Sequence, residues 1–335
     1  MLYDRIGVAG QKRLAESRVV LVGCGALGTV LANLLVRAGV GYLRICDRDF
    51  IERDNLQRQV LFDEDDIAAN LPKAEAAAAK LARINSAVTV EAVVTDVNPE
   101  NIERLVRGTD LILDGTDNFE TRYLINDLAV KIRRPWIYGA VIGAEGLSMT
   151  IIPYDTPCLR CVFESPPPSE SNPTCDTAGV IGPAVNMVAS LQAVETIKLL
   201  TGRTHELSRQ LTSVDAWTGR IAKLAVQNAY KPGFCPCCGL GDFSYLAGTR
   251  WSASATLCGR NAVQVHPGDT GGTDLPTIAR KLAAVANGPV EHNQFLLKVH
   301  LDGLGLTLFA DGRAIIHGTD DTVRARTLYA KYFGA

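Results

Sequence analysis

The chain has 335 residues, a formal net charge of −2 and the apolar and charged fractions of an ordinary soluble protein. This length suffices for one large domain and a small one, and the near-neutral charge excludes a general attraction to nucleic acid or anionic membranes. Residues 19–36 carry no charge, but their glycines and Asn33 argue against a membrane span. Nine cysteines, several in close pairs, fit metal binding in a cytosolic protein better than secreted disulfides. We therefore expect a cytoplasmic protein.

The first part of the chain is organised around a glycine-rich turn. Residues 19–22 read as a buried strand that stops at Gly23, and Gly23, Gly25 and Gly28 have G-x-G-x-x-G spacing. Such glycines allow a tight turn, close approach of backbone to phosphate, and helix packing on the strand. The next strand ends at Asp47, where an acid would meet a ribose hydroxyl. Because glycine-rich turns also serve packing, the nucleotide interpretation depends on strand, turn, helix and acid occurring in this order.

Two polar features after Asp47 can grip phosphate. The loop of residues 49–58 contains two arginines, Asn55 and Gln57, and Gln59 follows it; these side chains can hold phosphate oxygens, although composition alone favours a solvated loop. The next helix, residues 73–84, opens with Pro72 and then Lys73, whose charge opposes the helix dipole. A lysine at this place fits contact with an anion, although a solvated lysine is the commoner case.

Acidic residues follow the strand at 111–113, in the run Asp114-Gly-Thr-Asp117-Asn118. Ligands bind at the carboxyl ends of parallel strands in open α/β sheets, and a carboxylate there suits magnesium better than naked phosphate. Strands and helices alternate, so we predict an α/β protein with a Rossmann-like, doubly wound mixed sheet. The expected strands are 19–22, 42–46, 88–94, 111–113, 136–139 and 147–152, then an antiparallel pair at 211–216 and 221–226. The expected helices are 26–38, 73–84, 119–132 and 183–200.

Two C-x-x-C pairs indicate a metal site. They flank a proline-rich loop and the helix after it, and four thiols in two such pairs are typical of structural zinc. The alternatives are two redox pairs or buried thiols. Cys237, inside the second pair, is interpreted as a spare thiol, and Cys24, Cys46 and Cys258 as small buried residues. The expected zinc ligands are Cys158, Cys161, Cys235 and Cys238.

The last part of the chain is interpreted as a separate unit. We expect the large domain at residues 1–243, a linker at 244–256, and a small α+β domain at 257–335. No catalytic constellation is visible in the small domain, so we interpret it as an interaction or dimer-supporting module. Its expected elements are strands 262–266, 295–300, 304–309 and 313–317, with helices 275–286 and 321–332.

These motifs together resemble one family. The chain is similar to the ThiF/MoeB/HesA adenylyltransferases, bacterial relatives of the ubiquitin-activating enzymes, and most similar to the thiazole-biosynthesis branch. The resemblance spans nearly all of residues 6–240, and residues 258–261 and 311–313 resemble a C-terminal extension found in some members. The matching stretches are Gly23-Cys-Gly-Ala-Leu-Gly28, Asp47-Arg-Asp49, Asp54-Asn-Leu-Gln-Arg-Gln59, Leu71-Pro-Lys73, Thr116-Asp-Asn118, Thr174-Cys-Asp-Thr-Ala-Gly179 and the two C-x-x-C pairs.

The resemblance implies that a ubiquitin-like sulfur carrier presents its Gly-Gly carboxylate to the α-phosphate of ATP, giving an acyl-adenylate and pyrophosphate. It implies that Asp47 binds the ribose and Asp117 carries magnesium. Asn55, Arg58 and Lys73 would hold the triphosphate, which overturns the solvated interpretations above. Cys175 would link covalently to the carrier or its sulfur, unless it is a loop thiol with no role. The remaining residues assigned to the nucleotide are Gly23, Gly25, Gly28, Asp49 and Asn118.

The family also implies partners and a longer N-terminus. Members usually carry Arg-Tyr-x-Arg-Gln before a segment that corresponds to residues 6–11 here, and its second arginine reaches the ATP of the partner subunit. Only five residues precede that segment. We therefore expect a homodimer whose native chain starts further upstream, and a sulfurtransferase or cysteine desulfurase as a further partner.

Several alternatives remain open from sequence. An NAD-dependent oxidoreductase suits Gly23–Gly28 and Asp47 equally well, but leaves Arg58, Lys73 and the cysteines unexplained. A non-catalytic scaffold of the same fold would not need every phosphate-facing residue. Within the family, a MoaD-type carrier for molybdopterin synthesis fits as well, and the near-neutral charge disfavours a tRNA-modifying dehydratase.

Overall fold

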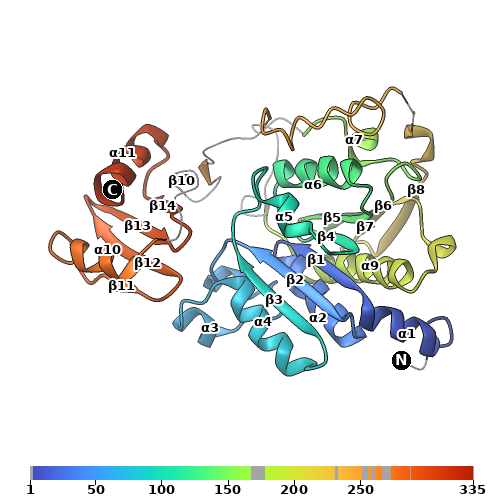
Figure 1. Cartoon of the computed structure of the whole chain (residues 1–335), viewed down its shortest axis with the longest axis horizontal. Helices are drawn as coiled ribbons and strands as arrows, with labels where there is room; N and C mark the ends of the chain where they lie inside the picture. Colours follow the sequence, from blue (N-terminus) through green and yellow to red (C-terminus); the bar gives the residue numbers. More distant parts are fainter. Residues whose placement is uncertain are drawn as a thin grey trace. The chain divides into compact units, whose positions relative to one another are not determined.

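The computed structural model describes all residues except 1–2, 167–177, 231–232, 251–255, 258–260, 266–272, 287 and 335 (Figure 1). It divides into two compact units, Met1–Trp251 and Ser252–Ala335. None of the described helices combines the length and the hydropathy that crossing a membrane requires.

The first unit is built on an eight-stranded mixed sheet with the order β3-β2-β1-β4-β5-β6-β7-β8. Strands β1 to β5 run parallel, and the pairs from β5 to β8 are antiparallel. This is the doubly wound mixed sheet predicted from the sequence. The strands are β1 (Arg18–Val22), β2 (Tyr42–Asp47), β3 (Thr89–Val94), β4 (Leu111–Asp114), β5 (Trp136–Ile142), β6 (Glu145–Ile151), β7 (Leu211–Asp215) and β8 (Arg220–Leu224).

Helices cover both faces of this sheet (Figure 1). In β1, Val19 and Leu21 belong to one hydrophobic core while Val20 and Val22 belong to the other, because successive side chains of a strand point to opposite faces. The first core includes residues of α1 (Gly7–Glu16), α2 (Ala26–Ala38), α4 (Lys73–Ile84) and α9 (Gly182–Leu200). The second includes residues of α5 (Ile102–Val106), α6 (Phe119–Lys131) and α7 (Leu159–Val162).

The sequence predicted the long helices well and missed the short ones. Helix α2 ends at Gly39, whose φ of +86° is the left-handed conformation that glycine adopts without strain. Helices α3 (Glu64–Ala68), α5 and α7 are too short to show a helical period. The N-cap of α3 nevertheless had a signal, because Asp63 and Asp66 form a capping box there. The 3-10 turns are η1 (Arg53–Asn55), η3 (Thr204–Glu206) and η4 (Gln227–Ala229).

The second unit is a small antiparallel sheet with two helices and a core of its own. Its strand order is β11-β12-β13-β14-β10-β9, and the Asp311-Gly312 turn joins β13 to β14. Helix α10 ends at Leu282, four residues before the expected end. The elements are β9 (Thr256–Leu257), β10 (Ala262–Val265), α10 (Leu275–Leu282), β11 (Glu291–His292), β12 (Leu296–Leu301), β13 (Leu304–Phe309), β14 (Ala314–His317) and α11 (Thr322–Tyr332).

Candidate functional site

Polar residues gather at the carboxyl ends of β1, β2 and β4. Strands β2 and β4 pair with β1 on its two sides, so the chain leaves β1 at the point where the strand order reverses (Figure 1). Ligands of open α/β sheets bind at this switch point. We call Gly25, Asp47, Lys73 and Asp117 the strand-end cluster.

The three glycines of the turn are needed for different structural reasons. Gly23 has a φ of +90°, and a Cβ on it would lie 2.6 Å from the carbonyl oxygen of Gly115. A Cβ on Gly28 would lie 2.1 Å from the carbonyl oxygen of Gly23. Gly25 is different, because its Cβ would meet only Gln59 Nε2, at 3.9 Å. Packing within the chain therefore explains Gly23 and Gly28, whereas the open space at Gly25 fits the close approach of a phosphate.

Asp47 shapes the glycine-rich turn. Its Oδ2 accepts the N–H of Cys24 at 2.5 Å, and its Oδ1 accepts the N–H of Asp49 at 2.7 Å. Burial raises the pKa of Asp47, while the nearby Lys73 ammonium opposes that effect. The carboxylate therefore fixes the backbone of both segments, and its remaining lone pairs are suited to ribose hydroxyls.

Lys73 is a buried cation, with 4% of its surface exposed. Its N–H donates to the carbonyl oxygen of Asp49 at 2.9 Å, and its Nζ lies 3.3 Å from Asp49 Oδ2. Burial by itself lowers the pKa of Lys73, but surrounding carboxylates outweigh it and raise the pKa above its ordinary value. Those carboxylates belong to Asp49, Asp47 and Asp117. A charged ammonium is thus held at the end of β2, where it can meet a phosphate.

Arg48 is a second cation here that the sequence reasoning did not select. Its Nη1 lies 3.0 Å from Asp96 Oδ1, and its Nε lies 3.7 Å from Asp49 Oδ1. Burial by itself lowers the pKa of Arg48, but the carboxylates of Asp96, Asp49 and Asp117 outweigh this effect and raise the pKa above its ordinary value. The only sequence signal was its place between the two acids of the Asp47-Arg-Asp49 stretch.

The loop after β2 uses Asn55 in its own structure. The Asn55 side chain accepts the N–H of Glu52 at 3.2 Å and donates to Asp54 Oδ1 at 2.8 Å, which closes the turn η1. Arg58 is half-buried, and its Nη1 donates to the carbonyl oxygen of Asp54 at 2.7 Å. Gln59, whose Nε2 faces Gly25, has a buried Oε1 that finds no hydrogen-bond partner among the described residues. An orphaned acceptor in a side chain beside this space fits a site completed by a bound ligand.

Asp117 and Asn118 follow β4. Asp117 is exposed, and its charge acts on both Lys73 and Arg48, which places it with the strand-end cluster. Carboxylate oxygens are ligands that Mg²⁺ accepts, so Asp117 fits a magnesium–triphosphate site. Asn118 Oδ1 instead accepts the N–H of Thr121 at 2.8 Å and caps α6.

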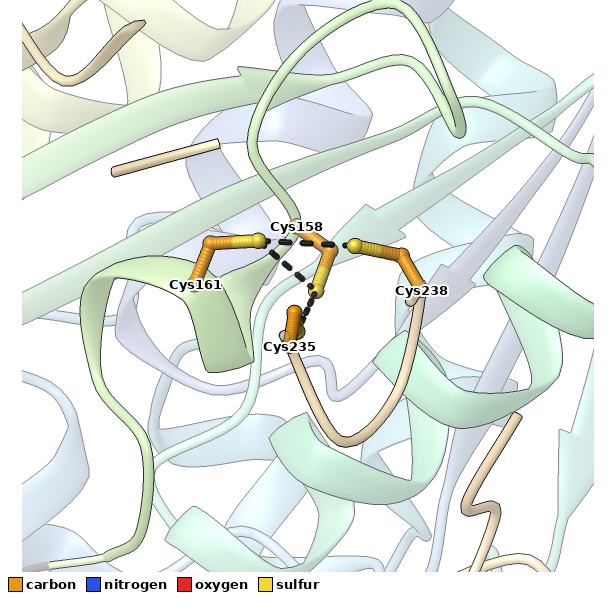
Figure 2. Close-up of side chains that lie close together, drawn as sticks. All are labelled: Cys158, Cys161, Cys235 and Cys238. Atoms are coloured by element: carbon orange, nitrogen blue, oxygen red, sulfur yellow. Dashed lines mark hydrogen bonds between the residues drawn. The ribbon is translucent and has the colours of Figure 1, made fainter. Parts of the chain in front are cut away.

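The structure brings the two C-x-x-C pairs together (Figure 2). Cys158 Sγ lies 3.7 Å from Cys161 Sγ and 3.6 Å from Cys235 Sγ, and Cys161 Sγ lies 3.4 Å from Cys238 Sγ. All four sulfurs are within 4.8 Å of one another. A tetrahedral zinc–thiolate site with bonds of about 2.3 Å has sulfurs about 3.8 Å apart. This cysteine cluster therefore fits zinc and leaves no position for a further ligand.

Residues of α6 hold the cysteine cluster in place, and no sequence pattern pointed to them. Asn126 is buried; its Oδ1 accepts the N–H of Leu159 at 2.8 Å, and its Nδ2 donates to Cys237 Sγ at 3.3 Å. Asp127 Oδ2 accepts the N–H of Tyr245 at 3.0 Å. Cys237 is not one of the four clustered thiols, as the sequence predicted, and it instead accepts a hydrogen bond from Asn126. These contacts attach both cysteine segments to α6.

A hollow of about 450 Å³ lies at the turns that join β5 to β6 and β7 to β8. Its lining includes Gly143, Ala178 and Trp217, and 83% of the Trp217 side chain is exposed. Gly143 also exchanges backbone hydrogen bonds with Gly179 and Ile181, which end the proline-rich loop after Cys161. We call this loop the crossing loop, and its end borders the hollow. Cys175 lies outside the described residues, as do Thr174 and Cys258.

The chain matches the model of the ThiF family over residues 1–237. The Bacillus subtilis (strain 168) "Sulfur carrier protein ThiS adenylyltransferase" is 45% identical over 333 residues, which are 99% of this chain and 97% of that protein. The Thermus thermophilus "Sulfur carrier protein adenylyltransferase" is 38% identical, over 75% of this chain and 95% of that protein. The crystal structure of E. coli MccB with MccA-N7isoASN aligns with a TM-score of 0.60 and 25% identity over 69% of each chain. On this evidence, the chain belongs to the ThiF family.

Proposed function

We propose that this protein adenylylates the C-terminal Gly-Gly carboxylate of a ThiS-like sulfur carrier, for synthesis of the thiamine thiazole. The observation that carries the proposal is the strand-end cluster, where an open glycine turn, a buried lysine and an exposed carboxylate converge. The Bacillus subtilis relative, which is matched over nearly its whole length, supports the ThiS-like carrier. This chain covers only 52% of the Xenopus laevis relative "Adenylyltransferase and sulfurtransferase MOCS3", which therefore gives weaker support for its own activity here. A MoaD-type carrier is accordingly the second candidate.

In this proposal the chain positions ATP and offsets its charge. The turn at Gly25 receives the phosphates, Asp47 binds the ribose, and Lys73 with Arg58 stabilises negative charge that builds at the α-phosphate. The carrier carboxylate attacks that phosphorus, and the bond to pyrophosphate breaks. Magnesium held by Asp117 would neutralise the outgoing phosphates. No side chain needs to act as a covalent group in this step.

The cysteine cluster has a structural role in this proposal. Four thiolates saturate a tetrahedral zinc ion, so a substrate cannot reach the metal. The zinc would join the loop that carries Cys158 and Cys161 to the segment that carries Cys235 and Cys238. That link would anchor the base of the crossing loop, on which the family resemblance places Cys175 as the residue for sulfur transfer.

The proposal also includes the partners. The carrier would dock beside the hollow at Trp217, where Ile221 and Leu224 of β8 add exposed apolar surface. An exposed tryptophan next to a hollow is a typical anchor for a protein partner. A homodimer in the cytoplasm, with a cysteine desulfurase or sulfurtransferase as sulfur donor, completes the proposed setting.

The test is ATP–pyrophosphate exchange in the presence of a Gly-Gly-ended carrier. Lys73→Ala and Asp117→Ala should each lower the exchange rate by about 100-fold or more, because each removes a charge that acts in the transition state. Lys80→Ala is the matched control, since Lys80 lies on the same helix but pairs with Asp63 and Asp66. Exchange that survives both cluster variants would refute the mechanism, and binding of NADH in place of ATP would support the oxidoreductase alternative.

A further inference from the structure

Arg122 forms a buried ion pair beneath the turn that presents Asp117. It is the fourth residue of α6, yet only 6% of its side chain is exposed, and its partner Asp114 is fully buried. Arg122 Nε lies 3.2 Å from Asp114 Oδ2. Burying two charges costs several kcal/mol per ion unless both are paired and hydrogen-bonded. The buried pair is therefore stable only in an arrangement that also provides its other hydrogen-bond partners.

Those partners are Thr116, which follows β4, and Gly139, in the middle of β5. Arg122 Nη2 donates to the carbonyl oxygen of Thr116 at 2.6 Å and to that of Gly139 at 3.2 Å. Asp114 accepts the N–H of Thr116 at 2.9 Å, its hydroxyl at 2.7 Å and the N–H of Gly139 at 3.3 Å. One ion pair thus binds the N–H, the hydroxyl and the carbonyl of Thr116, and Asp117 is the next residue.

Helix α9 closes the same network from the other face of the sheet. Gln192 Nε2 donates to the carbonyl oxygens of Asp114 and Ile137, at 2.9 and 3.3 Å. A Cβ on Gly139 would lie 2.5 Å from the Gln192 amide, so the strands and the helix are in close contact here. The ends of the backbone segments that support Thr116 and Asp117 therefore have little room to shift.

Asp117 lies between two fixed neighbours, because Thr116 is held by the ion pair and Asn118 caps α6. We propose that Arg122 is a positioning residue, which acts through Asp114 and Thr116 to aim the Asp117 carboxylate at a divalent cation on the triphosphate. This rests on the proposed function, in which Asp117 carries that cation. Residues behind a metal ligand commonly change metal affinity by about 10- to 100-fold.

The experiment measures metal binding directly. Mn²⁺ is titrated into the full-length protein with saturating non-hydrolysable ATP analogue, and bound Mn²⁺ is followed by electron paramagnetic resonance. We expect Arg122→Lys to weaken Mn²⁺ binding by about tenfold, because lysine cannot bind Asp114 and both carbonyls at once. Metal-free affinity for the analogue should change by less than about twofold. Arg44→Lys is the control, since Arg44 also binds a carboxylate, Glu91, and a backbone carbonyl, but away from the strand-end cluster.

Two further variants separate the possible failures. Asp117→Asn should abolish the metal-dependent signal, and if it binds Mn²⁺ like the wild type, the proposed role of Asp117 is wrong and the Arg122 proposal falls with it. If Asp117→Asn loses the signal but Arg122→Lys binds Mn²⁺ normally, Arg122 is structural only. Thr116→Val removes a single hydrogen bond to Asp114 and should weaken Mn²⁺ binding by about threefold if Arg122→Lys does not fold. A normal affinity in that variant would then overturn the proposal.

Discussion

The strand-end cluster and the cysteine cluster lie in the same unit but differ in where their side chains point. The four sulfurs of the cysteine cluster face one another, and a single tetrahedral ion would use all of them as ligands. At the strand ends, Gly25 borders open space, Gln59 has an orphaned acceptor and Asp117 is exposed. A metal site whose ligands all come from the chain stabilises the fold, whereas a site with open space is completed by a ligand that binds and dissociates. The predictions below test this difference.

The largest effect is expected at the cysteine cluster. Cys235→Ser should release the zinc and lower the free energy of unfolding by an amount on the order of 10 kcal/mol, as structural zinc contributes in small domains. Elemental analysis of protein purified under reducing conditions, with denaturant unfolding, measures both quantities. One zinc per chain is expected in the wild type. Wild-type protein that contains no zinc, or a variant as stable as the wild type, would contradict a structural metal site.

A paired substitution in the glycine turn tests the open side of the comparison. Gly28→Ala places a methyl group 2.1 Å from the carbonyl oxygen of Gly23, so it should destabilise the fold by roughly 3 kcal/mol. Gly25→Ala meets no such contact and should leave stability nearly unchanged. It should instead weaken ATP binding by about tenfold, or about 1.4 kcal/mol, because the methyl group occupies the phosphate space.

Thermal unfolding and calorimetric ATP titration of both glycine variants check this pair. If Gly25→Ala binds ATP as well as the wild type, the open space at the turn does not receive the phosphates. If Gly28→Ala is as stable as the wild type, the close approach of α2 to the turn is not what requires that glycine.

The smallest effect is expected at Asn118, which the family resemblance assigns to the nucleotide but which caps α6 in the structure. Asn118→Ala should cost about 1 kcal/mol of stability, while Asn118→Ser keeps a capping oxygen and should cost a few tenths of that. The exchange rate of Asn118→Ser should remain close to that of the wild type. A stable Asn118→Ser variant with little exchange would instead assign the amide to the nucleotide.

The sequence predicted what depends on local pattern. The continuous apolar run in β1, the glycine spacing and the paired cysteines each have a physical signature within a few residues, and the mixed sheet and the cysteine cluster agree with them. The short helix α5 has too few residues to display a period. Arg122 and Asn126 were missed because their partners, such as Gly139 and Cys237, are distant in sequence. No local pattern distinguishes a buried arginine on a helix from a solvated one.

The most direct test of the central claim is mass spectrometry of the carrier after incubation with this protein, ATP and magnesium. The account predicts that a carrier ending in Gly-Gly gains the mass of one adenylyl group, which is AMP less one water, in a form that hydroxylamine cleaves, while a carrier lacking its last glycine gains nothing. The gain should disappear with Lys73→Ala and persist with Lys80→Ala. A wild-type protein that leaves every Gly-Gly carrier unmodified, or that modifies the truncated one equally, would contradict the account.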